Sequence, residues 1–212
     1  MDIAIPIYPG FTALDAVGPY EVLSNLPGAT VRFIAAEPGP VTADTGMLTL
    51  VAEASLDEVP APEIVCVPGG RGTEAAIADR RIVDWVRAAH DGSEWTTSVC
   101  TGAQVLGAAG ILDGLEATTY WMALDSLRDY GARPCVQRVV RQGKVVTAAG
   151  VSSGIDMALT LASLIAGDDV AQAIQLGIEY DPQPPFDAGS EAKAPDHVRE
   201  IVRAAAAQRS PA

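Results

Sequence analysis

Cys100 lies where two sequence patterns meet. Residues 94–99 have the pattern of a strand, and residues 102–109 follow a helical pattern, so no loop separates the two. A cysteine at such a junction occupies a strained turn at the carboxyl edge of a sheet, beside helix N–H groups that lack partners. Those groups and the helix dipole favour a thiolate and stabilise an anion formed during a reaction. The pattern predicts a nucleophilic cysteine; an inert buried thiol is the alternative.

A carboxylate and a glycine-rich loop are predicted to lie at the same sheet edge. Asp15 follows the first strand, where it could exchange a proton with Cys100 as general acid or base. The alternative is that Asp15 only favours the first turn of its own helix. Gly69 and Gly70 directly follow another strand, and their lack of side chains lets the backbone approach a ligand. We expect Gly70 and Thr101 to supply backbone donors for an oxyanion, unless the glycines only form a plain turn.

Neither histidine is placed to act as the base of this cysteine. His90 and His197 lie in helical patterns that do not end at this sheet edge. Their positions disfavour papain-like hydrolysis and glutamine amide cleavage, and leave Asp15 as the proton carrier. Cys66, inside an apolar strand, and Cys135, at the start of another, are predicted to be packed thiols. The cysteines show no pair spacing suited to zinc, so no metal site is expected.

Short apolar runs alternate with longer helical patterns, as in α/β proteins whose parallel strands are joined by crossover helices. Several runs are apolar on both faces, which places those strands inside the sheet. We expect strands over residues 2–7, 30–36, 49–51, 64–67, 95–99, 135–140 and 145–148, and helices over residues 14–26, 73–79, 81–91, 102–110, 120–130, 154–166, 170–177 and 195–207.

Composition indicates one globular domain over residues 1–212, with a frayed tail over residues 208–212. The chain has 212 residues, of which 49% are hydrophobic, enough for a full core. Its formal net charge of -13 disfavours nucleic acid and anionic membranes as partners. The N-terminus has no secretion-signal pattern, no apolar run spans a bilayer, and the cysteines are odd in number. We therefore expect a cytoplasmic protein with reduced thiols.

Several motifs together resemble the ThiJ/PfpI superfamily, which is related to class I glutamine amidotransferases. The resemblance implies a flavodoxin-like, mostly parallel sheet with helices on both faces and a nucleophile elbow at Cys100. The same motifs occur in the N-terminal module of some AraC-type regulators, but no helix-turn-helix pattern follows here, so we expect no DNA-binding module. The motifs span residues 9–19, 67–70, 99–102, 117–121, 149–156 and 179–187.

Within this superfamily the motifs are most similar to the isonitrile hydratase branch, in which an Asp faces the nucleophile and a Thr follows it. This resemblance implies hydration of an organic isonitrile to an N-substituted formamide without a cofactor, in a homodimer. Cys100 would form a thioimidate, Asp15 would act as general acid and base, and Thr101 would support the intermediate. The residues expected around the substrate or oxyanion are Gly69, Gly70, Tyr120, Trp121, Gly150 and Ile155.

Tyr120 departs from the superfamily pattern, because relatives often carry His at this position. The change disfavours His-assisted amidohydrolase or peptidase chemistry and fits a reaction in which Asp15 moves the proton. The alternative is that it alters substrate choice or weakens activity. Tyr120 retains a hydroxyl that can donate a hydrogen bond into the site. Two other functions stay open: a redox sensor that oxidises Cys100 without turnover, and a glyoxalase-like enzyme acting on reactive carbonyls.

Overall fold

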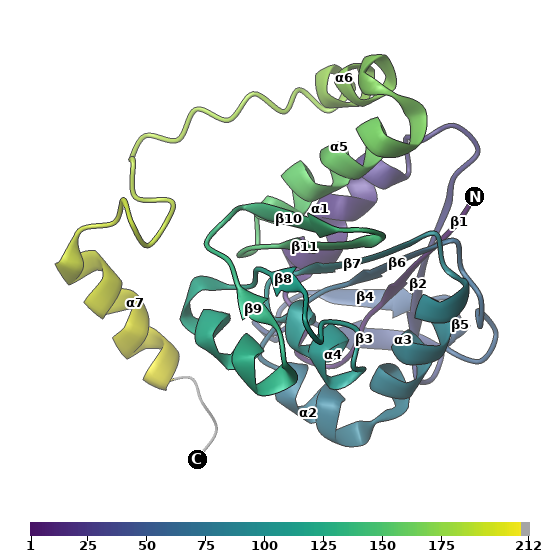
Figure 1. The fold of residues 1–212 in the computed structure, drawn as a ribbon, viewed down its shortest axis with the longest axis horizontal. Helices are drawn as coiled ribbons and strands as arrows, with labels where there is room; N and C mark the ends of the chain where they lie inside the picture. The colour runs from purple at the N-terminus through teal and green to yellow at the C-terminus, as the bar shows by residue number, and fades with distance from the viewer. Residues whose placement is uncertain (209–212) are drawn as a thin grey trace. The chain divides into compact units, whose positions relative to one another are not determined.

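The computed structural model describes residues 1–208. The chain divides into two units, Met1–Ile178 and a second that begins at Glu179. The first unit contains the sheets and most of the helices, and the second contains α7 (Asp196–Gln208), drawn in yellow in Figure 1. The expected frayed tail over residues 208–212 lies, apart from Gln208, outside the described residues.

The central sheet of the described chain has seven strands in the order β10-β11-β7-β6-β1-β2-β5 (Figure 1). All neighbouring strands are parallel except β10 and β11, which are antiparallel. All four residues of β6 are buried, as expected for a strand covered on both faces. The predicted α/β class with a mostly parallel sheet is therefore confirmed. The strands are β1 (Asp2–Pro6), β2 (Thr30–Ala35), β5 (Ala54–Ser55), β6 (Ile64–Val67), β7 (Trp95–Val99), β10 (Val139–Gln142) and β11 (Val145–Ala148).

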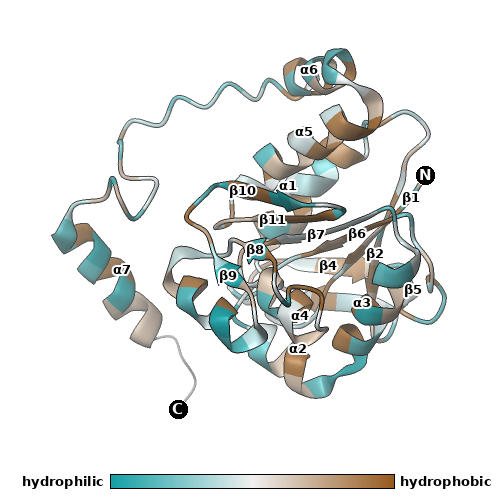
Figure 2. Cartoon of the chain, viewed as in Figure 1, coloured by the Kyte–Doolittle hydropathy of each residue, from teal (hydrophilic) through white to brown (hydrophobic). Residues whose placement is uncertain are grey.

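Helices cover both faces of this sheet. On one face α1, α5 and α6 pack together, and on the other α2, α3 and α4 do so (Figure 1). One buried cluster joins Ile64 of the sheet to Leu161, and a larger one joins Val65 to Leu106. The apolar strands between the helix layers are visible as brown arrows in Figure 2. The helices are α1 (Ala13–Leu23), α2 (Thr73–Asp79), α3 (Arg81–Gly92), α4 (Gly102–Ala108), α5 (Ser153–Ala166) and α6 (Asp168–Gly177).

Some smaller elements differ from the sequence expectation. The strand predicted over residues 135–140 begins only at Val139, because the Cys135 N–H bonds to Ala117 O (2.8 Å) of a separate small sheet. The predicted helix over residues 120–130 is a 3₁₀ helix, η1 (Trp121–Tyr130). The hairpin of β3 (Gly39–Thr42) and β4 (Thr49–Ala52) and the pair β8 (Glu116–Ala117) and β9 (Arg133–Pro134) complete the fold. Across residues 1–208, no helix combines the length and apolarity that crossing a membrane requires.

Candidate active site

Cys100 sits on a strained turn between β7 and α4. Its φ of 56° lies in the left-handed region, which is costly for a residue with a side chain. Three hydrogen bonds hold the turn: the Cys100 N–H contacts Ala148 O (3.1 Å) and Ala149 O (2.8 Å), and its carbonyl accepts from Thr119 Oγ1 (2.6 Å). The residue is only 5% exposed. The surrounding structure therefore fixes both the conformation and the accessibility of this cysteine.

Asp15 lies in the first turn of α1 and is fully buried. Its Oδ2 accepts a hydrogen bond from the Gly69 N–H (2.9 Å), whereas Oδ1 has no hydrogen-bond partner among the described residues. Burial raises the pKa of Asp15 to about 7, an effect that the Gly69 N–H and the Cys100 thiol oppose and the charge of Asp44 reinforces. The carboxyl group is consequently poised to gain or lose a proton near neutral pH.

The Cys100 thiol interacts with the Asp15 carboxyl group. The Oδ1 atom of Asp15 nevertheless has no well-formed hydrogen bond within the described residues. Burial, followed by the charge of Asp15, raises the pKa of the thiol to about 12, while hydrogen bonds from the backbone N–H groups of Thr101 and Val151 lower it. Above pH 7 the two groups share one proton, and the thiolate forms when this proton moves to the carboxylate. The pair therefore titrates as a coupled unit.

The backbone N–H groups of the glycine loop hydrogen-bond to side chains of the same chain. The Gly69 N–H donates to Asp15, and the Gly70 N–H donates to Thr101 Oγ1 (2.9 Å), so both amides have partners in this structure. A Cβ on Gly69 would lie 2.4 Å from the Thr101 backbone nitrogen, so only glycine fits there. Thr101 Oγ1 also lies 2.8 Å from Thr73 Oγ1. The loop and the nucleophile turn are thus joined by short polar contacts.

The sequence reasoning overlooked two hydroxyl groups behind this loop. Thr73 Oγ1 lies 3.0 Å from the Tyr8 hydroxyl, which donates to Pro68 O (2.8 Å). Burial raises the pKa of Tyr8, and the charges of Asp15 and Cys100 raise it further. The one available signal was the position of Tyr8 just after the first strand, at the edge where the other site residues were expected.

Tyr120 and Gly150 lie beside the nucleophile. A Cβ on Gly150 would come within 3.0 Å of Tyr120 Cδ2, so the Tyr120 ring covers this glycine. Burial raises the pKa of Tyr120, and so does the charge of Cys100, whereas a hydrogen bond with Trp121 lowers it. The Trp121 ring meets the Tyr120 ring nearly edge-on, with centroids 5.9 Å apart. The two aromatic rings thus contact each other, and Tyr120 is the one that interacts with Cys100.

Two further residues, Ile155 and His90, have contacts with α1 and with the start of β7. Ile155, in the first turn of α5, packs toward α1, where its Cγ1 lies 3.1 Å from the position of a Cβ on Gly18. His90 Nδ1 lies 2.8 Å from Thr96 Oγ1, at the start of β7, whereas Cys100 follows the end of that strand. His90 is therefore remote from the sulfur.

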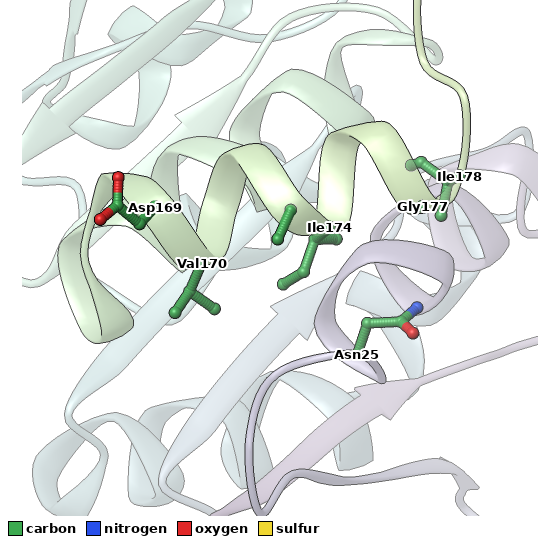
Figure 3. A pocket seen from close by; sticks show the side chains of 7 residues that line it. Asn25, Asp169, Val170, Ile174, Gly177 and Ile178 are labelled. Carbon is green, nitrogen blue, oxygen red and sulfur yellow. The ribbon is translucent and has the colours of Figure 1, made fainter.

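An open groove of about 470 Å³ lies between the C-terminal end of α1 and α6 (Figure 3). Asn25, Val170 and Ile174 are among its lining residues. Asn25 follows the end of α1, whereas Asp15 lies at its start. The groove is thus lined by none of the residues predicted for the active site.

The profile of the DJ-1/PfpI family matches residues 1–164. The chain belongs to the DJ-1/PfpI family. It is 42% identical over 207 residues to isonitrile hydratase from Pseudomonas putida, covering 98% of this chain and 90% of that protein. It is 28% identical to an HTH-type transcriptional regulator from Pseudomonas aeruginosa, over 78% of this chain and 51% of the regulator.

A solved ThiJ/PfpI family protein from Pseudomonas syringae matches this DJ-1/PfpI chain with a TM-score of 0.94 and 38% identity. The match covers 99% of this chain and 87% of that one. The family and the fold inferred from the sequence motifs are therefore confirmed.

Proposed function

We propose that this protein hydrates an organic isonitrile to an N-substituted formamide, with Cys100 as nucleophile and Asp15 as general acid and base. The observation that carries the proposal is the buried carboxyl of Asp15 beside the Cys100 thiol, with His90 remote from both. The 42% identity to the isonitrile hydratase of Pseudomonas putida supports the same substrate class.

In the first step the Cys100 thiolate forms a bond to the terminal carbon of the isonitrile. The proton held by Asp15 moves to this carbon, and the carbon–nitrogen bond order falls from three to two. The product is a neutral thioimidate, R–N=CH–S–Cys, beside the Asp15 carboxylate. Passing the proton to the substrate avoids an unpaired negative charge on a buried adduct.

In the second step water attacks the thioimidate carbon. Asp15 transfers one proton of this water to the nitrogen and accepts the other as the carbon–sulfur bond breaks. The formamide leaves, and the Cys100–Asp15 pair regains its single proton. The N–H groups of Thr101 and Val151, which hydrogen-bond to the sulfur, stabilise the departing thiolate.

The remaining expected site residues stay part of this proposal. The rings of Tyr120 and Trp121 would contact the substituent of the substrate, beside Gly150, which the Tyr120 ring covers. Gly69 and Gly70 would act through Asp15 and Thr101, to which their N–H groups are bonded. Ile155 would line the substrate's approach only if the bound substrate reaches toward α1.

We also propose a cytoplasmic homodimer that needs no cofactor. Uncovered apolar side chains support self-association: Met47 and Val51 on the β3–β4 hairpin are largely exposed. Light scattering on the purified full chain measures its mass in solution. A monomer at micromolar concentration would contradict the homodimer but would leave the proposed chemistry untouched.

The central test is formamide production from cyclohexyl isonitrile. We expect turnover by the wild type and by Cys135→Ser, the matched control, and none by Cys100→Ala. Retained turnover in Cys100→Ala would rule out the covalent mechanism. An inactive wild type would refute the hydratase proposal, and intact mass after peroxide treatment and activity on methylglyoxal would then test the sensor and glyoxalase-like functions.

A further inference from the structure

Arg138 contacts both ends of the turn formed by residues 149–152. Its carbonyl accepts a hydrogen bond from the Ala149 N–H (2.9 Å). Its guanidinium donates through Nε to Asp156 Oδ2, in the first turn of α5, and through Nη2 to Ser152 Oγ (3.3 Å). A planar guanidinium with several fixed donors is suited to hold two partners at once. One residue outside the active site therefore ties this turn to the start of α5.

The inner side of the same turn faces the nucleophile. The Cys100 N–H bonds to Ala149 O (2.8 Å). The Val151 N–H lies near enough to the Cys100 thiol to lower its pKa. Between them lies Gly150, whose carbonyl accepts from the Ser153 N–H and Oγ, both at 2.9 Å. Hydrogen bonds weaken steeply when their geometry is distorted. A small displacement of the turn would thus weaken the contact between Val151 and the sulfur.

The sulfur depends on such amides because its charged neighbours do not favour a thiolate. Within residues 1–208 the titratable groups that interact with it are Asp15 of α1, Tyr8 after β1 and Tyr120 before η1. All three are acids, which repel a thiolate when ionised. No cation of the described chain acts on the sulfur directly. Backbone N–H groups are therefore the stabilising partners that the structure supplies.

We propose that Arg138 is a positioning residue, which fixes the turn of residues 149–152 so that the Val151 N–H meets the Cys100 sulfur. Arg138 acts through the turn, because its own charge is paired with Asp156. The inference rests on the proposed nucleophilic role of Cys100, but it does not depend on which substrate Cys100 attacks.

The test measures alkylation of Cys100 by iodoacetamide between pH 5 and 10 in the full-length chain. A Cys135→Ser background removes the partly exposed thiol, and peptide mass mapping separates Cys100 from the buried Cys66. In Arg138→Met we expect the plateau rate to fall about three- to tenfold, as for weakening, without complete loss, of one hydrogen bond to the thiolate. The midpoint should stay near the pKa of Asp15, about 7.

Arg141→Met is the matched control, since this arginine bonds Gly143 O and stacks on Trp95, away from the turn. It should leave the alkylation profile unchanged. A purely structural role of Arg138 predicts the opposite sign, because loosening the fold exposes a sulfur that is 5% accessible and accelerates alkylation. An accelerated or unchanged rate in Arg138→Met would overturn the proposal.

The link to Asp156 has its own test. Because Arg138→Met and Asp156→Ala remove the same contact, the double variant should lose no more reactivity than Arg138→Met alone. Additive losses would contradict the proposed route. Alkylation needs no isonitrile, so a wild type that alkylates at Cys100 without turning over isonitriles would refute the hydratase proposal while still testing Arg138.

Discussion

Replacing Asp15 by Asn should stabilise the protein at neutral and alkaline pH while abolishing the proposed activity. Burial raises the pKa of Asp15 from 3.8 to about 7. The folded state therefore holds a proton that the unfolded chain releases between about pH 4 and pH 7. Across this window the stability of the wild type falls as pH rises, and the full cost of the buried charge is present above pH 7.

The size of this effect follows from the pKa difference. A rise of about 3 pKa units, at about 1.4 kcal/mol each, corresponds to about 4 kcal/mol above pH 7. The Asn side-chain oxygen can still accept a hydrogen bond from the Gly69 N–H. Its N–H₂ group would then take the position of Asp15 Oδ1, where no hydrogen-bond partner is found among the described residues. This mismatch costs about 1 kcal/mol. We therefore expect Asp15→Asn to gain about 3 kcal/mol at pH 8.

Urea unfolding of both proteins at pH 4, 6 and 8 measures this difference. The advantage of Asp15→Asn should shrink as pH falls and vanish or reverse at pH 4, where the wild-type carboxyl is protonated in the folded state. Asp57→Asn, at an exposed position, is the control and should not change the pH slope. A destabilised Asp15→Asn at pH 8, or an unchanged pH slope, would refute the reasoning.

Three further outcomes are expected. The kcat/KM for cyclohexyl isonitrile should rise with pH through about 7, because the Cys100–Asp15 pair loses its first proton there; a decline over this range in a pH–rate profile would contradict the shared-proton mechanism. Thr119→Val removes the donor to Cys100 O and should lower the free energy of unfolding by about 1–3 kcal/mol in urea; an unaltered midpoint would show that this carbonyl finds another donor. Gly69→Ala forces the loop away from the Thr101 nitrogen and should cut turnover and lower the melting temperature, whereas Gly92→Ala, with open space around its position, should do neither.

The sequence was sufficient to predict which strand ends meet. Cys100 and Asp15 each follow an apolar run, and the carboxyl ends of parallel strands share one edge of a sheet, so their proximity could be expected before the structure was known. Strand and helix periodicity also placed β6, β7 and α4 closely. These features depend on local hydrophobic patterns, which a single sequence carries.

The supporting groups could not be predicted in the same way. The Thr119 hydroxyl and the Val151 N–H reach Cys100 from loops whose paths depend on tertiary packing. The sequence suggested the Gly70 N–H as a free donor, but only the structure shows that Thr101 Oγ1 accepts it. Cys135 was expected to begin a strand that the structure starts only at Val139, because the local sequence carries no information about which sheet a segment joins.

The two edges of the central sheet limit how copies of this chain can associate. At one edge β5 has only two residues, and at the other β10 has four and carries Arg141. Such short edges offer few unpaired backbone groups for another strand to add to, which protects the sheet against edge-to-edge aggregation. Two copies would therefore have to meet through side chains and not by pairing strands of the central sheet, and denaturants that disrupt apolar contacts should separate them before the sheet unfolds.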